Sequence, residues 1–162
     1  MPLLSYFHFS FTVSDLERSI EFYRDKIGLK LVHRMIHDHP YTSQQIGYPN
    51  ALLKVALFTI EGMHQSPSGH FLELIEYVRP RGEPLEVATN RPGAAHLAFH
   101  VDDIHAEFAR LKALGVRFKS PEPVKIMAGR HAGGWACYML DPDDITLEMN
   151  QLPENFQPDD LA

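Results

Sequence analysis

The sequence predicts an α+β fold of two tandem β-α-β-β-β modules, and the main observation behind this prediction is an internal repeat. The segment HFSFTVSDL, beginning at His8, returns as HLAFHVDDI at His96, and FLELIEYV, beginning at Phe71, returns as ITLEMNQL at Ile145. Apolar and polar residues alternate in these segments with the period of a half-buried strand. After the opening segment of each copy, apolar residues recur at helical spacing. Each copy therefore reads as a strand, a helix and further strands.

The first module opens with a strand in which Phe7, Phe9, Phe11 and Val13 form the apolar face, so His8 points away from the core. Ser14 and Asp15 can cap the helix that follows, and Gly28 can end it. The expected elements, in order, are strand 7–13, helix 16–27, a short strand at about 29–34, strand 51–60 and strand 71–78.

The second module repeats this plan. Asp102 or Asp103 can cap its helix, and Gly115 can end it. The turn DPDD places Asp144 where a left-handed backbone conformation is expected, which aspartate tolerates. The expected elements are strand 96–101, helix 104–114, a strand beginning in VRFKS, strand 135–140 and strand 145–150.

The first module carries an insertion. His96 follows His8 by 88 positions, whereas Glu148 follows Glu73 by 75, so the first module is longer by thirteen residues. The excess falls in HRMIHDHPYTSQQIGYPN, residues 33–50, which has no apolar period and is expected to be an extended loop. Long loops on compact scaffolds often carry function.

The candidate metal ligands are His8, Glu73, His96 and Glu148, which occupy matching places in the repeat, each on the polar face of its strand. Two imidazoles and two carboxylates suit a divalent first-row ion and leave coordination positions for water or substrate oxygens. Glu76 is the competing carboxylate of the first module. It lies on the apolar parity of its strand, which favours Glu73.

Composition and charge exclude some classes of protein. The chain has 162 residues, 44% of them hydrophobic, which is enough for one well-cored domain or two small modules that share a core. Its formal net charge of −6 and scattered basic residues predict no nucleic-acid partner. No window is long and apolar enough to cross a membrane, and the first residues do not resemble a signal peptide, so a cytoplasmic location is expected.

The expected domain organisation is a single domain at 5–152 followed by a polar tail at 153–162. Within the domain, module one covers 5–78 and module two covers 94–152. The intervening linker, 79–93, is rich in proline, glycine and charge, as module connections are.

These segments resemble the vicinal oxygen chelate superfamily, which includes glyoxalase I, bleomycin resistance proteins and extradiol dioxygenases. The resemblance is carried by HFSFTVSDLERSIEFYRDKIGLKLV, LELIEY, AHLAFHVDDI and DPDDITLE. It implies a sheet that curls around a metal cavity and a homodimeric assembly. It also implies that His8, Glu73, His96 and Glu148 bind the metal, with Glu148 and Glu73 transferring protons.

The activity that this resemblance implies is a glyoxalase I-like lyase or isomerase acting on a small substrate with two vicinal oxygens. Its cofactor would be one divalent ion of nickel, cobalt, zinc, manganese or iron. One departure from the family's epimerases is Lys54, which stands where they carry an acid and argues against an epimerase.

Two alternatives remain open from the sequence. An extradiol-type dioxygenase would use His8, His96 and Glu148 to bind iron, although Glu73 would then occupy room needed for substrate and oxygen. A metal-free binding protein for a small molecule such as an antibiotic is the other alternative. In such proteins the ligand positions are normally eroded, and here all four are present.

Four further residues are candidates for lining the substrate site. His100 shares a strand face with His96, and Arg79 could hold an anionic group of the substrate. Tyr41 and Tyr48 belong to the insertion and could form a lid.

Overall fold

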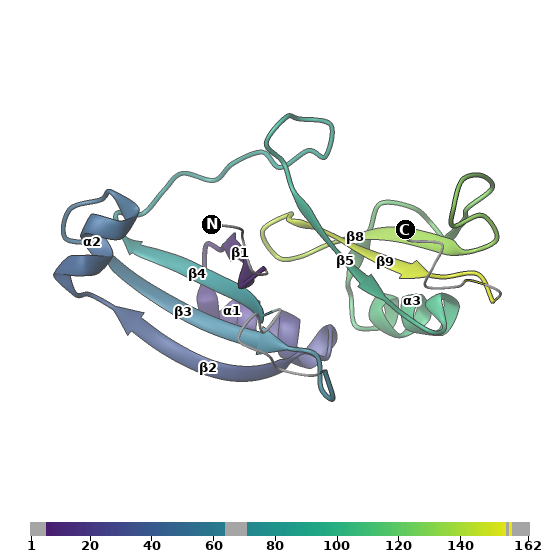
Figure 1. Ribbon diagram of the computed structural model, residues 1–162, viewed down its shortest axis with the longest axis horizontal. Helices are drawn as coiled ribbons and strands as arrows, with labels where there is room; N and C mark the ends of the chain where they lie inside the picture. Colours follow the sequence, from purple (N-terminus) through teal and green to yellow (C-terminus); the bar gives the residue numbers. More distant parts are fainter. Residues whose placement is uncertain (1–5, 64–70, 155, 157–162) are drawn as a thin grey trace, which may run out of the picture. The chain divides into compact units, whose positions relative to one another are not determined.

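The computed structural model describes residues 6–63, 71–154 and 156, so most of the expected tail lies outside the described residues. The chain divides into two compact units, Met1–Leu85 and Glu86–Ala162. Each unit contains one curled sheet with a helix against one face, and the fold is the mixed α+β class that the sequence predicts (Figure 1).

The first unit has a four-stranded sheet in the order β1-β4-β3-β2. Strand β1 runs parallel to β4, and the other neighbours are antiparallel. Its elements are β1 His8–Thr12, α1 Leu16–Glu21, the π-helical turn η1 Phe22–Lys26, β2 Lys30–His37, α2 Pro40–Ile46, β3 Leu52–Thr59 and β4 Phe71–Arg79.

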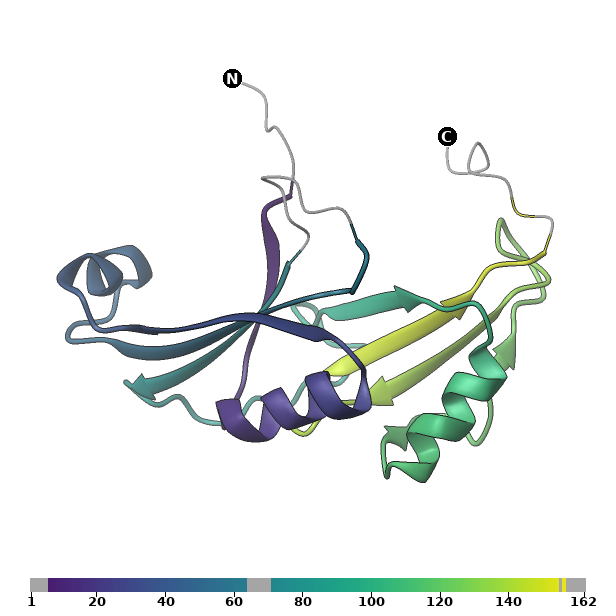
Figure 2. The ribbon, with the colours of Figure 1, turned by 90° about the horizontal axis from the view of Figure 1, so that it is seen from below.

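Helix α1 lies across one face of the sheet (Figure 2), and the side chains of its apolar stripe are buried. Asp15 caps the helix by accepting a hydrogen bond from the Arg18 N–H at 3.0 Å. The last turn widens into η1, where the Ile27 N–H donates to the Phe22 carbonyl. Gly28 then ends the helix with a φ of 88°, a conformation that glycine adopts without strain.

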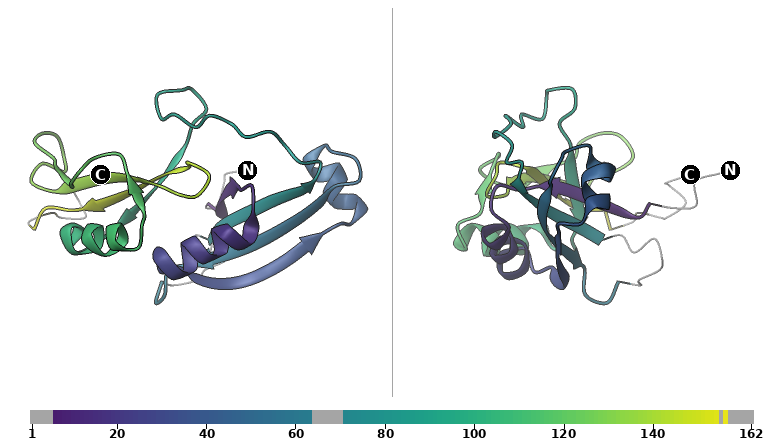
Figure 3. Two further views of the ribbon diagram at one scale, coloured as in Figure 1. Left: turned by 180° about the vertical axis from the view of Figure 1, so that it is seen from behind. Right: turned by 90° about the vertical axis from the view of Figure 1, so that its left-hand side faces the viewer.

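The second unit repeats this topology with the sheet order β5-β9-β8-β6, while β7 also pairs with β8. Strand β5 runs parallel to β9, as β1 does to β4. Figure 3 shows helix α3 against this sheet from behind. The elements are β5 His96–His100, α3 Ile104–Ala113, β6 Arg117–Phe118, β7 Val124–Lys125, β8 Trp135–Leu140 and β9 Thr146–Gln151.

The local signals of the second module are confirmed. Asp103 caps α3 by accepting hydrogen bonds from the backbone N–H groups of His105 and Ala106. Asp144 has a φ of 65°, as the DPDD turn predicts. Leu114, the last residue of the expected helix 104–114, is the C-cap of α3 and is 43% exposed.

The expectation of an extended loop at residues 33–50 is wrong. Strand β2 is not short: it continues to His37 and pairs with β3 along its whole length, with a bulge between Leu31 and His33. The segment then forms α2, which begins with Pro40 at its first turn and ends at Gly47, with a φ of 76°. The bulge shifts the side-chain alternation by one residue. The sequence of β2 therefore does not show the regular alternation of apolar and polar residues that predicts a strand.

The apolar face of β1 is less buried than its alternation suggests. Phe7 and Phe9 are 67% and 45% exposed, whereas Val13 is buried. Strand β1 forms one edge of its sheet, and α1 packs against β3 and β4. The aromatic residues at the start of β1 are therefore left uncovered by the helix.

Candidate metal centre

The first unit brings two of the predicted ligands together. His8 pairs with Phe71 across the β1–β4 ladder, and Glu73 lies two residues further along β4, on the same face of the sheet. The Nε2 atom of His8 is 3.4 Å from the Oε2 atom of Glu73.

The second unit contains the same arrangement. His96 pairs with Thr146 across the β5–β9 ladder, and Glu148 lies two residues further along β9. The Nε2 atom of His96 is 3.1 Å from the Oε2 atom of Glu148. The two modules therefore place an imidazole and a carboxylate in the same register on the same kind of sheet face.

The solvent exposure of the two pairs also matches. The side chains of His8 and His96 are 37% and 42% exposed, whereas those of Glu73 and Glu148 are 15% and 16% exposed. In each pair the carboxylate is shielded by the sheet and the imidazole is open to solvent. Such a pair can accept an ion from solution while restricting the motion of the carboxylate.

In neither unit does a third His, Cys, Asp or Glu of the described residues join the pair to form a metal-binding group. A histidine and a glutamate supply two ligands, while catalytic sites for first-row ions use at least three protein ligands. One pair alone is therefore an incomplete site.

The residue types and distances fit a divalent ion. Ligand atoms about 2.1 Å from such an ion lie about 3.0 Å apart at neighbouring octahedral positions and about 3.4 Å apart at tetrahedral ones. The separations of 3.1 and 3.4 Å within the two pairs fall in this range. Neither pair would need a large rearrangement to bind an ion.

Glu76 points to the opposite face of β4 from Glu73. Its Oε2 atom accepts a hydrogen bond from the backbone N–H of Leu16 at 3.1 Å and lies 3.4 Å from the Lys54 Nζ. Lys54 thus belongs to the helix-covered face. The lysine that stands where the family's epimerases carry an acid is therefore on the opposite face of the sheet from Glu73.

The two tyrosines of the insertion are exposed and make aromatic contacts. Tyr41 stacks on His39, and its hydroxyl lies 3.4 Å from the Nδ1 atom of His37. Tyr48 packs edge-on against Tyr77, with ring centroids 6.2 Å apart. Tyr77 is four residues beyond Glu73 on β4 and shares its face. Tyr48 therefore contacts the sheet face that carries Glu73.

Arg79 is already engaged by the backbone. Its Nε atom donates to the Asn50 carbonyl at 2.6 Å, which ties the end of β4 to the segment after α2. Its exposed guanidinium retains further donors, so a contact with substrate stays a prediction.

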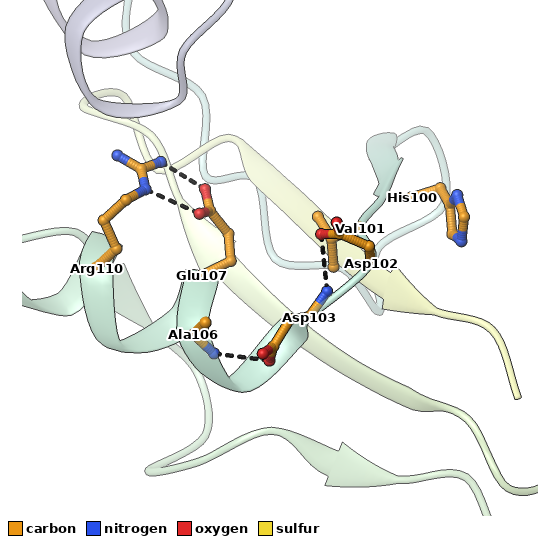
Figure 4. Close-up of a pocket in the computed structure, with 7 residues that line it drawn as sticks. All are labelled: His100, Val101, Asp102, Asp103, Ala106, Glu107 and Arg110. Carbon is orange, nitrogen blue, oxygen red and sulfur yellow. Dashed lines mark hydrogen bonds and ion pairs between the residues drawn. The ribbon is translucent and has the colours of Figure 1, made fainter. Parts of the chain in front are cut away.

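His100 lines a hollow of about 530 Å³ at the start of helix α3, drawn in Figure 4. The polar side chains that line this hollow are largely engaged by other groups of the protein. Asp103 caps the helix, and Glu107 forms an ion pair with Arg110. The hollow contains neither His96 nor Glu148, the two predicted ligands of this unit.

Sequence reasoning missed Tyr138 and Lys119, which lie beside the second pair. Tyr138 is directly opposite Glu148 in the β8–β9 ladder, and its ring centroid is 5.4 Å from that of His96. Lys119 follows the two-residue strand β6, and its N–H donates to the Tyr138 carbonyl. For Tyr138 the sequence did offer a signal, because Ala136, Tyr138 and Leu140 alternate along β8 and therefore share one face of the strand.

Two groups on β8 have raised pKa values. Burial, followed by the negative charge of Glu148, raises the pKa of the Cys137 thiol to about 11. The same two causes raise the pKa of the Tyr138 hydroxyl. Tyr138 therefore stays protonated at neutral pH and can donate a hydrogen bond.

Two modules that each hold a histidine–glutamate pair on one sheet face define an α+β protein built from an internal repeat. The chain belongs to the Glyoxalase/Bleomycin resistance protein/Dioxygenase superfamily, whose family model matches residues 5–149. Among the described residues, no helix combines the length and apolar character that crossing a bilayer requires.

Two relatives are similar to this chain in sequence, and one solved structure is similar to it in fold. The chain is 29% identical over 150 residues to a 2-epi-5-epi-valiolone epimerase from Actinomyces sp, covering 90% of this chain and 78% of the relative. It is 26% identical over 156 residues to a lactoylglutathione lyase from Schizosaccharomyces pombe, covering 88% of this chain and 45% of that protein. A glyoxalase family protein from Bacillus cereus has a similar crystal structure, with a TM-score of 0.78, 19% identity and coverage of 94% and 97%.

Proposed function

We propose that this chain is a divalent-metal-dependent isomerase or lyase acting on a small substrate with two vicinal oxygens. The observation that carries the proposal is the repeated pair, with His8 and Glu73 at 3.4 Å and His96 and Glu148 at 3.1 Å in identical strand register. The named relatives support this class of reaction, because one is an epimerase and the other a lyase.

All four residues act as ligands of one ion in this proposal. Each pair supplies half of a two-imidazole, two-carboxylate set, which suits nickel, cobalt, zinc, manganese or iron. When bound, the ion supplies Lewis-acid polarisation of a substrate oxygen. This makes the neighbouring C–H of the substrate more acidic.

The proton is moved by Glu148 and Glu73. Each carboxylate has one oxygen beside its histidine, which leaves the other oxygen to accept a proton from carbon. Two carboxylates allow one to remove the proton and the other to return it. This is the requirement for an isomerase that inverts or relocates a C–H bond.

The assembly in this proposal is a homodimer. Strands β1 and β5 each form an edge of their sheet, and the exposed Phe7 and Phe9 lie just before and within β1. Exposed edges with apolar side chains favour association with another strand or surface. A second copy of the chain would cover them and bring additional ligand pairs into the assembly.

The test of this function is solvent exchange at carbon. The protein would be incubated in D2O with a panel of α-hydroxy ketones, and deuterium incorporation would be followed by NMR. We expect exchange with metal-loaded protein and its loss on chelation. Glu148→Gln should slow it by about a hundredfold or more, the scale of general-base catalysis.

Glu76→Gln is the matched control, because Glu76 lies on the opposite face of β4 and should leave exchange unchanged. Exchange that survives chelation would contradict the proposal. Oxygen uptake with ring cleavage of catechols would instead favour the dioxygenase, and ligand binding without any metal would favour a binding protein.

A further inference from the structure

The two sheet faces that carry the ligand pairs differ in chemistry immediately beside those pairs. In the first unit the residue paired with His8 is Phe71, and the residue opposite Glu73 is Leu57. In the second unit the corresponding positions hold Thr146, paired with His96, and Tyr138, opposite Glu148. Two apolar side chains of the first module are thus replaced by hydroxyl-bearing ones in the second, while His33 pairs with Leu57 on the next strand, β2.

Lys119 adds a positive charge to the polar surround. Its Nζ atom donates to the Thr146 Oγ1 atom at 3.0 Å and lies 5.7 Å from the centroid of the Tyr138 ring. These two contacts fix the ammonium group over the sheet face that also carries Glu148. The lysine is therefore held in place, although its side chain is exposed.

The ammonium of Lys119 is not neutralised by the protein. Among the described residues, no carboxylate forms an ion pair with it. An ammonium group has three N–H donors, and the Thr146 hydroxyl uses one of them. Two donors and a full positive charge remain for a ligand, a combination that binds carboxylate or phosphate oxygens.

We propose that Lys119, with Thr146 and Tyr138, forms a subsite that binds an anionic group of the substrate beside the His96–Glu148 pair. This inference rests on the proposed function, since it names the class of substrate for that site: a small vicinal-oxygen compound with a carboxylate or phosphate. The charge of Lys119 then sets the orientation of the substrate on this sheet face.

The test compares three probes that share a vicinal oxygen pair: glycerol 3-phosphate, glycerate and glycerol. Binding to the full chain, with and without metal, would be followed by NMR titration. We expect saturable binding of at least one anion and weaker binding of glycerol by about tenfold or more. Preference for glycerol 3-phosphate would identify a phosphate group, and preference for glycerate would identify a carboxylate.

The decisive variants are Lys119→Met, which keeps the apolar stem, and Lys119→Gln, which keeps a donor for Thr146 but removes the charge. Both should weaken anion binding about tenfold or more while leaving glycerol binding unchanged. Lys112→Met is the matched control, because Lys112 also lies over an aromatic ring, 5.3 Å from that of Phe108, but on helix α3. It should bind the anions as the wild type does.

The proposal is overturned if the wild type binds neither anion, if either Lys119 variant binds as the wild type does, or if Lys112→Met loses binding equally. Metal content and the thermal unfolding midpoint, measured on the same samples, separate this outcome from failure of the proposed function. Anion binding that depends on Lys119 in a protein that takes up no metal would retain the subsite and reject the metal-dependent reaction. Normal metal uptake with no role for Lys119 in anion binding would reject the subsite and leave the metal-dependent reaction standing.

Discussion

Glu73 and Glu76, three residues apart on strand β4, point to opposite faces of the sheet and contact different groups. The carboxylate of Glu73 meets His8 on the open face. The carboxylate of Glu76 accepts the first free N–H of helix α1 from Leu16 on the covered face. The alternation of the strand thus assigns one carboxylate to the proposed ion and the other to the helix.

Glu76→Gln should therefore retain metal binding. The second module already performs the same task with an amide, because the Gln151 Oε1 atom accepts the Ile104 N–H at 2.9 Å. We expect a change of less than about 1 kcal/mol in the free energy of unfolding, since the contact with Lys54 is partly exposed. Elemental analysis and chemical denaturation would check this. Loss of metal in Glu76→Gln, with retention in Glu73→Gln, would show that the assigned register is wrong.

Cys137 should be unreactive in the folded protein. Its pKa of about 11, against an ordinary value of 9.0, leaves at pH 8 roughly a hundredth of the thiolate of an ordinary cysteine. Alkylation by iodoacetamide at pH 8 should be at least that much slower in the native than in the denatured protein. Equal rates would contradict the buried position of the thiol.

The same shift has a consequence for stability. The unfolded thiol loses its proton at lower pH than the folded one, so its stabilising contribution is present below about pH 9 and is lost as the pH rises towards 11. The free energy of unfolding should fall more steeply over this range in the wild type than in Cys137→Ala. If the free energy of unfolding depends on pH in the same way in both proteins, the raised pKa of Cys137 is contradicted.

Mixing two defective chains distinguishes how the ligand pairs combine. If each site draws its two pairs from different chains of a dimer, a mixed dimer of His8→Ala and Glu148→Ala chains contains one intact site. Random pairing of equal amounts then restores about a quarter of the wild-type metal content. We expect this recovery after the mixed chains are refolded together. No recovery would place each site within one chain, and monomeric behaviour in light scattering would reject the dimer.

Strand parity was the part of the site that the sequence could predict. The alternation around His8 and His96 and around Glu73 and Glu148 depends only on neighbouring residues, and the structure confirms which face each side chain occupies. The caps at Asp15 and Asp103 are local for the same reason.

The parts that escaped prediction depend on pairing between distant segments. The bulge between Leu31 and His33 can be recognised only once β2 is aligned with β3. The position of Lys119 over Tyr138 likewise requires β6 and β8 to be side by side. Helix α2 is an exception, because Pro40 and Gly47 are local start and stop signals that were present in the sequence.

The central claim is that His8, Glu73, His96 and Glu148 bind one ion together, and metal stoichiometry tests it most directly. Purified chain would be loaded with metal, dialysed and analysed by elemental analysis, with circular dichroism to confirm folding. We predict one ion per wild-type chain, near-complete loss in His8→Ala and in Glu148→Ala, and full retention in His100→Ala, a histidine on the same strand face as His96. Two ions per chain, or full occupancy in either ligand variant, would contradict the account.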